Sequence, residues 1–201
     1  MAEITSASGL RVSTIYQYFS SKDEIVWEVL ADIFAEDAQR AKQKIEAATT
    51  GLTKLAALFE FMAEELSFNR SKVRFLAQFD ALYARDWPAE RLLSLEAQIN
   101  PQGFEYFGKL IREGIADRSL RSDLEPDLTL HAVINAVAGA QRRLASLGDK
   151  VEQEYGQSID QLFRETIRIV LLGLRSDHGG STSESGTRLS SGKNSKRKRL
   201  L

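Results

Sequence analysis

The amino-acid sequence predicts an all-α protein, and two observations carry that prediction. Apolar residues recur every three or four positions along most of the chain, which is the spacing of one face of a helix. No stretch shows the alternation of apolar and polar residues that marks a half-buried strand. Only three of the 201 residues are proline and 43% are hydrophobic, so long helices around a shared core are possible. The longest strongly apolar run, Ile169 to Leu174, is too short to cross a bilayer, and no membrane partner is expected.

The stretch from Gly9 to Glu24 predicts a tight turn, a short helix, a second turn and the start of another helix. Gly9 tolerates a positive φ and therefore suits the corner between two packed helices. Leu10 would contact a small core. Ser13 and Thr14 would cap the short helix, because their hydroxyl oxygens can accept free backbone N–H groups.

The second turn carries an unusual cation. Ser21 and Glu24 have the spacing of a capping box and predict the start of a helix. Lys22 then lies in the first helical turn, where the helix dipole disfavours a positive charge unless an anion such as phosphate binds there. The hydroxyls of Tyr16 and Tyr18 would lie one short helix away. These three groups predict a clamp on a phosphate backbone; the alternative is an ordinary helical corner with a solvated lysine.

Seven further helices are expected from the apolar spacing, separated by breaks at 49–51, 86–88 and 100–101. Pro126 fits a first helical turn, where its missing N–H leaves no hydrogen bond unmade. Small residues over 136–140 would let another helix approach closely. The expected helices cover about 22–44, 52–66, 71–84, 88–97, 102–115, 127–147 and 158–174.

Two groups of residues resemble a known family. The first is Ile4, Ala7-Ser8-Gly9-Leu10, Ser13-Thr14-Ile15-Tyr16, Tyr18-Phe19 and Ser21-Lys22-Asp23-Glu24. It resembles the DNA-binding signature of the TetR family of transcriptional repressors. The second is Glu113-Gly114-Ile115, Leu120-Arg121, Asp123 and Pro126, which resembles the later half of these proteins.

The resemblance implies a helix-turn-helix that reads double-stranded DNA. The short helix, about Ser13 to Phe19, would enter the major groove. The residues nearest the base edges would be Arg11, Val12, Ser13 and Thr14. The residues that hold phosphates would be Tyr16, Tyr18 and Lys22. The resemblance also implies a homodimer on a palindromic operator, with the last two long helices forming a four-helix bundle with a second subunit. The alternative is that both helices pack within one monomer.

Two features depart from this pattern. The family begins with another helix, whereas Met1 already falls at the start of the second one, so we expect a chain started at an internal methionine or a fragment. Residues 1–30 carry two cations and four anions, a net charge of −2, which is unfavourable for binding a polyanion. Both features favour an alternative function, a helical dimerisation and ligand-binding module that does not bind DNA.

The chain divides into three expected parts. Residues 1–30 form a partial, truncated helix-turn-helix domain, and residues 31–175 form a helical domain that binds an effector and dimerises. Residues 176–201 are rich in serine, glycine and cations, with a net charge of +4, and are expected to be a disordered basic tail. Such a tail would add salt-dependent, nonspecific affinity for DNA.

An effector cavity is predicted among the central helices. Bulky side chains spread over these helices are usually core; the alternative, implied by the resemblance, is that some line a cavity for an unknown small lipophilic molecule. Asn135 and Gln141 would supply polar contacts. The bulky candidates are Phe59, Met62, Phe79, Tyr83, Trp87, Phe104 and Phe107.

Enzymatic chemistry is not indicated. The chain has no cysteine, which excludes disulfides and thiolate sites, and the absence of a secretion signal makes a cytoplasmic protein the expectation. It has two histidines, His131 and His178, and neither belongs to a metal or catalytic motif. No cofactor, metal or catalytic residue is therefore expected.

Overall fold

A computed structural model describes residues 1–101 and 103–176, with the side chains of Gly103 and Phe104 left out. The described part is helical, with no strand beyond an isolated bridge between Leu120 and Arg175. The helices are α1 (Ala2–Ser8), α2 (Val12–Tyr18), α3 (Lys22–Glu46), α4 (Gly51–Phe68), α5 (Arg70–Asp86), α6 (Ala89–Ile99), α7 (Gly103–Ala116), α8 (Pro126–Leu147), α9 (Lys150–Tyr155) and α10 (Ile159–Leu174).

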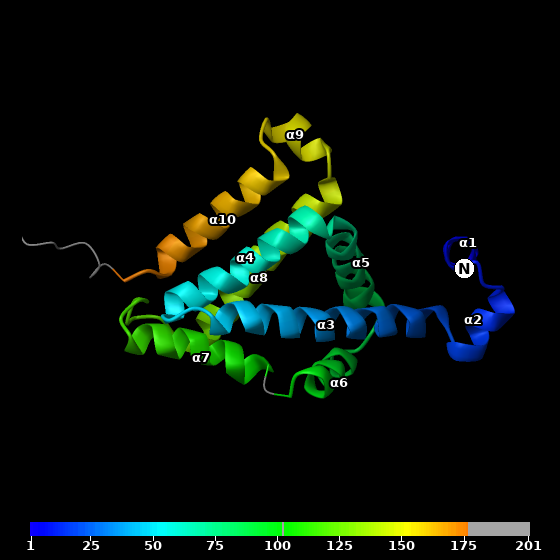
Figure 1. The fold of residues 1–201 in the computed structure, drawn as a ribbon, viewed down its shortest axis with the longest axis horizontal. Helices are drawn as coiled ribbons and strands as arrows, with labels where there is room; N and C mark the ends of the chain where they lie inside the picture. The colour runs from blue at the N-terminus through cyan, green and yellow to red at the C-terminus, as the bar shows by residue number, and fades with distance from the viewer. Residues whose placement is uncertain (102, 177–201) are drawn as a thin grey trace, which may run out of the picture.

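The long helix α3 sets the layout of the molecule. Figure 1 shows α1 and α2 at its N-terminal end, away from the helices that pack around its other half. At the centre, α4 packs against α3, α5, α7, α8 and α10, and α8 packs against α4, α5, α7, α9 and α10. The helix α3 therefore extends from the central body to the N-terminal helices.

Two apolar clusters hold this arrangement. The larger one joins the C-terminal half of α3 to α4, α7, α8 and α10, and its fully buried side chains include Phe59, Ile111, Val137 and Phe163. The smaller one joins the N-terminal half of α3 to α5 and α6 through Trp27 and Phe79, whose rings meet edge to face at 5.2 Å, with Leu30 and Leu76 also buried. At about 1.5–3 kcal/mol for each buried large side chain, the larger cluster carries most of the stability.

Local sequence signals fix several helix ends in the described part of the chain. The Ser21 hydroxyl accepts from the Glu24 N–H at 3.1 Å, and the Glu24 carboxylate accepts from the N–H of Ser20. Thr50 and Ser158 form capping boxes at the starts of α4 and α10. All seven helices expected after the second turn are present. The short α9, ended by Gly156 with a φ of 64°, was not predicted, because six residues are too few to show a helical period.

Two local predictions in the N-terminal part are wrong. The residue that caps α2 is Arg11, in extended backbone and without a side-chain cap bond, so Ser13 and Thr14 lie inside the helix. Leu10 contacts no core and is 47% exposed. Gly9 ends α1 with a φ of 68°, as the predicted corner requires.

The crossing of α4 and α7 needs two glycines. A Cβ on Gly51 would collide with the backbone of Gly114, and one on Gly114 would collide with the side chain of Leu120. The crossing is tied by two bonds to the start of α4: the Gly51 N–H donates to Asp117 at 2.8 Å and the Leu52 N–H donates to Ser119 at 3.0 Å. In the described part of the chain, no helix has the length and apolar character needed to cross a membrane.

Candidate functional site

The first candidate site is the surface around α2, and we call residues 1–22 the reader. Ile15 is the one buried residue described in α1 and α2, at 4% exposure, and Phe19 is partly buried. The rest of α2 faces outward: Val12 and Tyr16 are each 44% exposed and Tyr18 is 75% exposed. Burial of one side of so short a helix leaves its other sides open to a partner.

The residues predicted to contact DNA lie on this surface. Arg11, Val12 and Ser13 are exposed at the start of α2, and Thr14 is partly buried. Lys22 is exposed at the first position of α3. No hydrogen bond or ion pair within the described residues engages the side chains of Tyr16, Tyr18 or Lys22. Their polar groups are therefore available to a ligand outside the chain.

Acidic groups beside Lys22 are already engaged. The pKa of Glu24 is lowered by its hydrogen bonds with Ser20. Asp23 accepts a hydrogen bond at 3.3 Å from the indole N–H of Trp87, which closes the smaller apolar cluster near the start of α3. Both carboxylates thus have structural partners, and they contribute to the net charge of −2 over residues 1–30.

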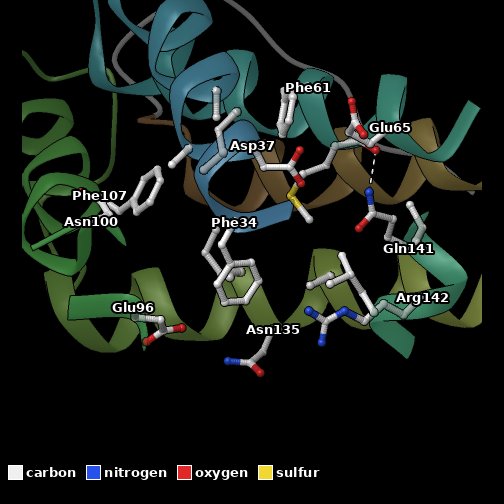
Figure 2. Close-up of a pocket in the computed structure, with 18 of the residues that line it drawn as sticks. Phe34, Asp37, Phe61, Glu65, Glu96, Asn100, Phe107, Asn135, Gln141 and Arg142 are labelled. Atoms are coloured by element: carbon white, nitrogen blue, oxygen red, sulfur yellow. Dashed lines mark hydrogen bonds between the residues drawn. The ribbon is translucent and has the colours of Figure 1, made fainter. Parts of the chain in front are cut away.

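The second candidate site is a cavity of about 400 Å³ enclosed by α3 to α8 (Figure 2). Its wall is mainly apolar, which suits a lipophilic ligand. Every one of these helices contributes a side chain, so the cavity lies between elements far apart in the sequence. The apolar wall includes Phe34, Leu58, Phe61, Met62, Val73 and Ile134.

A buried ionic cluster forms part of the wall. Lys72 of α5 binds Asp37 of α3, with the ammonium nitrogen 2.6 Å from Oδ1, and also binds Glu65 of α4. Arg40 lies 2.6 Å from the other Glu65 oxygen, and Asn69 donates to this carboxylate at 3.0 Å. These contacts join α3, α4 and α5 at the edge of the cavity.

The pKa shifts follow from this geometry. Burial raises the pKa of Asp37 despite its bond to Lys72. Burial acts the same way on Glu65, but the hydrogen bonds from Lys72 and Asn69 and the charges of Lys72 and Arg40 outweigh it and lower the pKa. Lys72 is held in its charged form, because its bonds to both carboxylates outweigh burial and raise its pKa. The pairing thus favours the charged forms of Glu65 and Lys72.

Some of the predicted effector residues line this cavity. Met62, Phe107 and Asn135 do, and so does Gln141, whose amide donates to the Met62 carbonyl at 2.6 Å. His131 lines it as well. Sequence reasoning missed several wall residues that Figure 2 labels, namely Phe34, Asp37, Phe61, Glu65, Glu96, Asn100 and Arg142.

Other predicted effector residues lie elsewhere. Phe59 is fully buried in the larger cluster on α4. Phe79, Tyr83 and Trp87 belong to the smaller cluster, where Phe79 stacks with Tyr83 at 5.8 Å and with Trp87 at 5.6 Å. The side chain of Phe104 lies outside the described part. These positions fit the packing interpretation that the sequence also allowed.

A third feature is the outer side of α8 and α10. On α8 the exposed residues Ala132, Ala136 and Gly139 are small. On α10, Ile169 and Leu172 are 58% and 52% exposed. Among the described residues there is no group of three or more histidine, cysteine, aspartate or glutamate side chains placed to hold a metal ion.

Comparison with curated proteins finds a relative whose sequence aligns with most of this chain. The chain is 26% identical, over 177 residues, to the HTH-type transcriptional repressor KstR2 of Mycolicibacterium smegmatis, covering 88% of this chain and 81% of that protein. No family model matches the chain. The proteins to which it is similar are transcriptional regulators and not enzymes.

Solved structures share the fold. The ketosteroid transcriptional regulator KstR2 of Mycobacterium tuberculosis has a TM-score of 0.63 at 21% identity, over 87% of this chain and 83% of that one. FadR from Bacillus subtilis in complex with stearoyl-CoA has a TM-score of 0.60 at 18% identity, over 87% and 88%. A TetR/AcrR-family regulator from Thermobifida fusca has a TM-score of 0.58 at 20% identity, over 86% and 85%. The signature around α2, the all-helical fold and the related repressor agree, and the chain is similar to transcriptional regulators of the TetR family.

Proposed function

We propose that this protein is a dimeric repressor that leaves its operator when a lipophilic effector enters the cavity. The observation that carries the proposal is the double role of α3. Its first residue, Lys22, belongs to the reader, and its later residues Phe34, Asp37 and Ala41 line the cavity. A ligand that shifts α3 by its contacts in the cavity also shifts α2.

The proposed DNA contacts follow from exposure and chemistry. Arg11 to Thr14, at the start of α2, would meet base edges in the major groove. The hydroxyls of Tyr16 and Tyr18 and the ammonium of Lys22 would hold phosphates on either side, which fixes register without reading sequence. Changes at Ser13 should therefore alter the preferred sequence, whereas changes at Tyr16 should weaken binding to all sequences alike.

The proposed dimer uses the outer side of α8 and α10. Small residues on α8 permit close approach of a second helix, and exposed Ile169 and Leu172 on α10 supply apolar area. Two copies would then form a four-helix bundle and present two readers to a palindromic operator. Leu172→Glu should produce monomers in analytical ultracentrifugation, whereas Leu93→Glu, at an exposed leucine of α6, should not.

The proposed effector is a lipophilic molecule. The apolar wall supports this class, and so do the relatives, one named for ketosteroids and one solved with stearoyl-CoA. By linkage, an effector that lowers affinity for DNA by a given factor has its own affinity lowered by DNA by the same factor. An allosteric effector lowers the affinity for DNA by a factor that reaches a plateau at saturation, whereas the effect of a molecule that competes for the DNA surface keeps growing with its concentration.

The experiment starts from DNA selection. The purified chain is used to select binding sequences from a random duplex pool, and the selected duplex is then titrated by fluorescence anisotropy with and without acyl-CoA and steroid probes. We expect selection of an inverted repeat and release by a lipophilic probe. Enrichment of no sequence at low salt, with probe binding intact, would instead support the second candidate function, a ligand-binding module without DNA binding, which the net charge of −2 over residues 1–30 favours.

A further inference from the structure

The charged side chains around the cavity differ in whether they have a hydrogen-bond or ion-pair partner. The cations of its wall are paired with carboxylates: Lys72 binds Asp37 and Glu65, and Arg142 binds Asp80. Glu96 of α6 also lines the wall and is partly buried, but no hydrogen bond or ion pair engages its side chain within the described residues. Of the carboxyl groups that line the described wall, Asp37, Glu65 and Glu96, the one without a partner is therefore Glu96.

Glu96 is separated from the paired charges. In Figure 2 it lies on one side of Phe34, while Gln141 and Arg142 lie on the other and Asp37 and Glu65 lie across the cavity. Burial is the cause that raises the pKa of Glu96, and no neighbouring cation lowers it. A ligand that fills this end of the cavity must either satisfy the carboxylate or leave it desolvated, and an unpaired desolvated charge is costly.

We propose that Glu96 selects the effector, favouring a lipophile that carries a hydrogen-bond donor, an amine or a hydroxyl, at the α6 end and rejecting one that carries a carboxylate there. This inference rests on the proposed function, since it assumes that the cavity is the effector site. An ammonium group gains a charged hydrogen bond, and a hydroxyl donates to the carboxylate. A carboxylate there meets like charge, because the lysine and arginine of the wall, Lys72 and Arg142, are paired with other carboxylates away from Glu96.

A matched set of probes tests the proposal on the full chain. Decylamine, decanol and decanoate share one alkyl chain and differ only in the head group. Their dissociation constants are measured by isothermal titration calorimetry at neutral pH, below their aggregation concentrations. We expect decylamine to bind more tightly than decanol, and decanol more tightly than decanoate. Equal binding of decylamine and decanoate to the unmodified chain would overturn the proposal.

The decisive variant is Glu96→Gln. This variant should bind decylamine about tenfold more weakly and decanoate several-fold more tightly. Its affinity for decanol should change by less than about threefold, since the amide can still accept a hydrogen bond. Glu96→Asp keeps the charge and should keep the order of the three probes. Glu90→Gln removes a charge from an exposed position of the same helix and should change none of them.

The outcomes separate this inference from the proposed function. A Glu96→Gln variant that shifts all three probes alike, or none of them, contradicts the role of Glu96 while the cavity remains a lipid site. Failure of every probe to bind the unmodified chain contradicts the cavity as a lipophilic effector site, and the inference falls with it.

Discussion

The reader and the body of this protein use their side chains in opposite ways. In the reader one residue, Ile15, is buried, while Leu10, Val12 and Tyr18 are exposed. In α4 alone many residues are buried, Leu55 among them. The body thus holds most of the buried apolar side chains, and the reader leaves most of its side chains exposed. Such a surface is what the proposed insertion of α2 into a DNA groove requires.

Polar groups show the same contrast. In the body, Glu65 is 3% exposed and is surrounded by Arg40, Lys72 and Asn69. In the reader, the side chain of Lys22 has no partner among the described residues. A buried charge needs a partner within the fold, whereas an exposed lysine is solvated and stays open to a ligand outside the chain.

The largest expected effect is on the α4–α7 crossing. Gly51→Ala should destabilise the protein by about 3 kcal/mol or more, because the added Cβ would meet the backbone of Gly114 and lie 2.7 Å from the Leu110 carbonyl oxygen. Urea unfolding measures the change. Gly173→Ala in α10 is the control: a Cβ there meets nothing within 4 Å, and the change should be neutral or stabilising by up to about 1 kcal/mol. Equal stability of the two variants would contradict the close crossing.

The next effect is on the buried ionic cluster. Glu65→Gln should lower stability at pH 7 by about 3 kcal/mol, because it leaves Arg40 and Lys72 without their shared carboxylate. Glu64→Gln is the control, since Glu64 pairs with Lys44 at a more exposed position and should cost less than about 1 kcal/mol.

The pH dependence of this pair of variants sharpens the comparison. The folded state lowers the pKa of Glu65 below its ordinary value of 4.5, so its contribution is present above that pH and is lost as pH falls through the folded value. The raised pKa of Asp37 has the opposite effect on the pH dependence of stability, and this effect is present in both the wild type and the Glu65→Gln variant. The stability gap between wild type and Glu65→Gln should therefore narrow on acidification below pH 4.5. A gap that stays constant would show that folding does not change the pKa of Glu65.

A smaller, local effect is expected in the reader. Ile15→Ala removes the buried contact of α2 and should destabilise the reader by about 2 kcal/mol, at the low end for an isoleucine truncation because the surrounding core is small. Hydrogen exchange should rise in α1 and α2 and stay unchanged in α4 and α8. Leu10→Ala, at a 47% exposed position, should change neither. Faster exchange throughout α8 would mean that reader and body unfold as one unit.

The contrast between the reader and the body also explains which structural features can be predicted from the sequence. Helix ends were predictable where a local signal exists: Thr50 and Ser158 form their caps, and Pro126 opens α8 as its fixed φ favours. The reader was predictable because its signature is local in sequence. Ser13 and Thr14 show the limit of such signals, since a hydroxyl near a helix start does not decide which residue is the cap.

The cavity was less predictable for a physical reason. Helix α4 is surrounded by five others, so its pattern does not say which of its apolar sides faces a hollow. Phe59 points into the core and Phe61, two residues later, lines the cavity. Lys72 and Asp37 are 35 residues apart and meet only through the packing of α5 on α3. Such pairings depend on helix rotation and crossing, which spacing along one helix does not contain.

The smallest expected effect tests the reader directly. Lys22→Ala should weaken binding to a selected operator and to unrelated duplexes by similar factors, because an ammonium on a phosphate reads no sequence. The slope of log affinity against log salt should fall in magnitude by about 1, the value expected for one lost phosphate contact. Lys42→Ala is the control on the same helix, because Lys42 is exposed near Glu46 in the body half and should leave the slope unchanged. If both variants leave it unchanged, the exposed ammonium of Lys22 does not contact DNA, and Tyr16 and Tyr18 would have to hold the backbone without it.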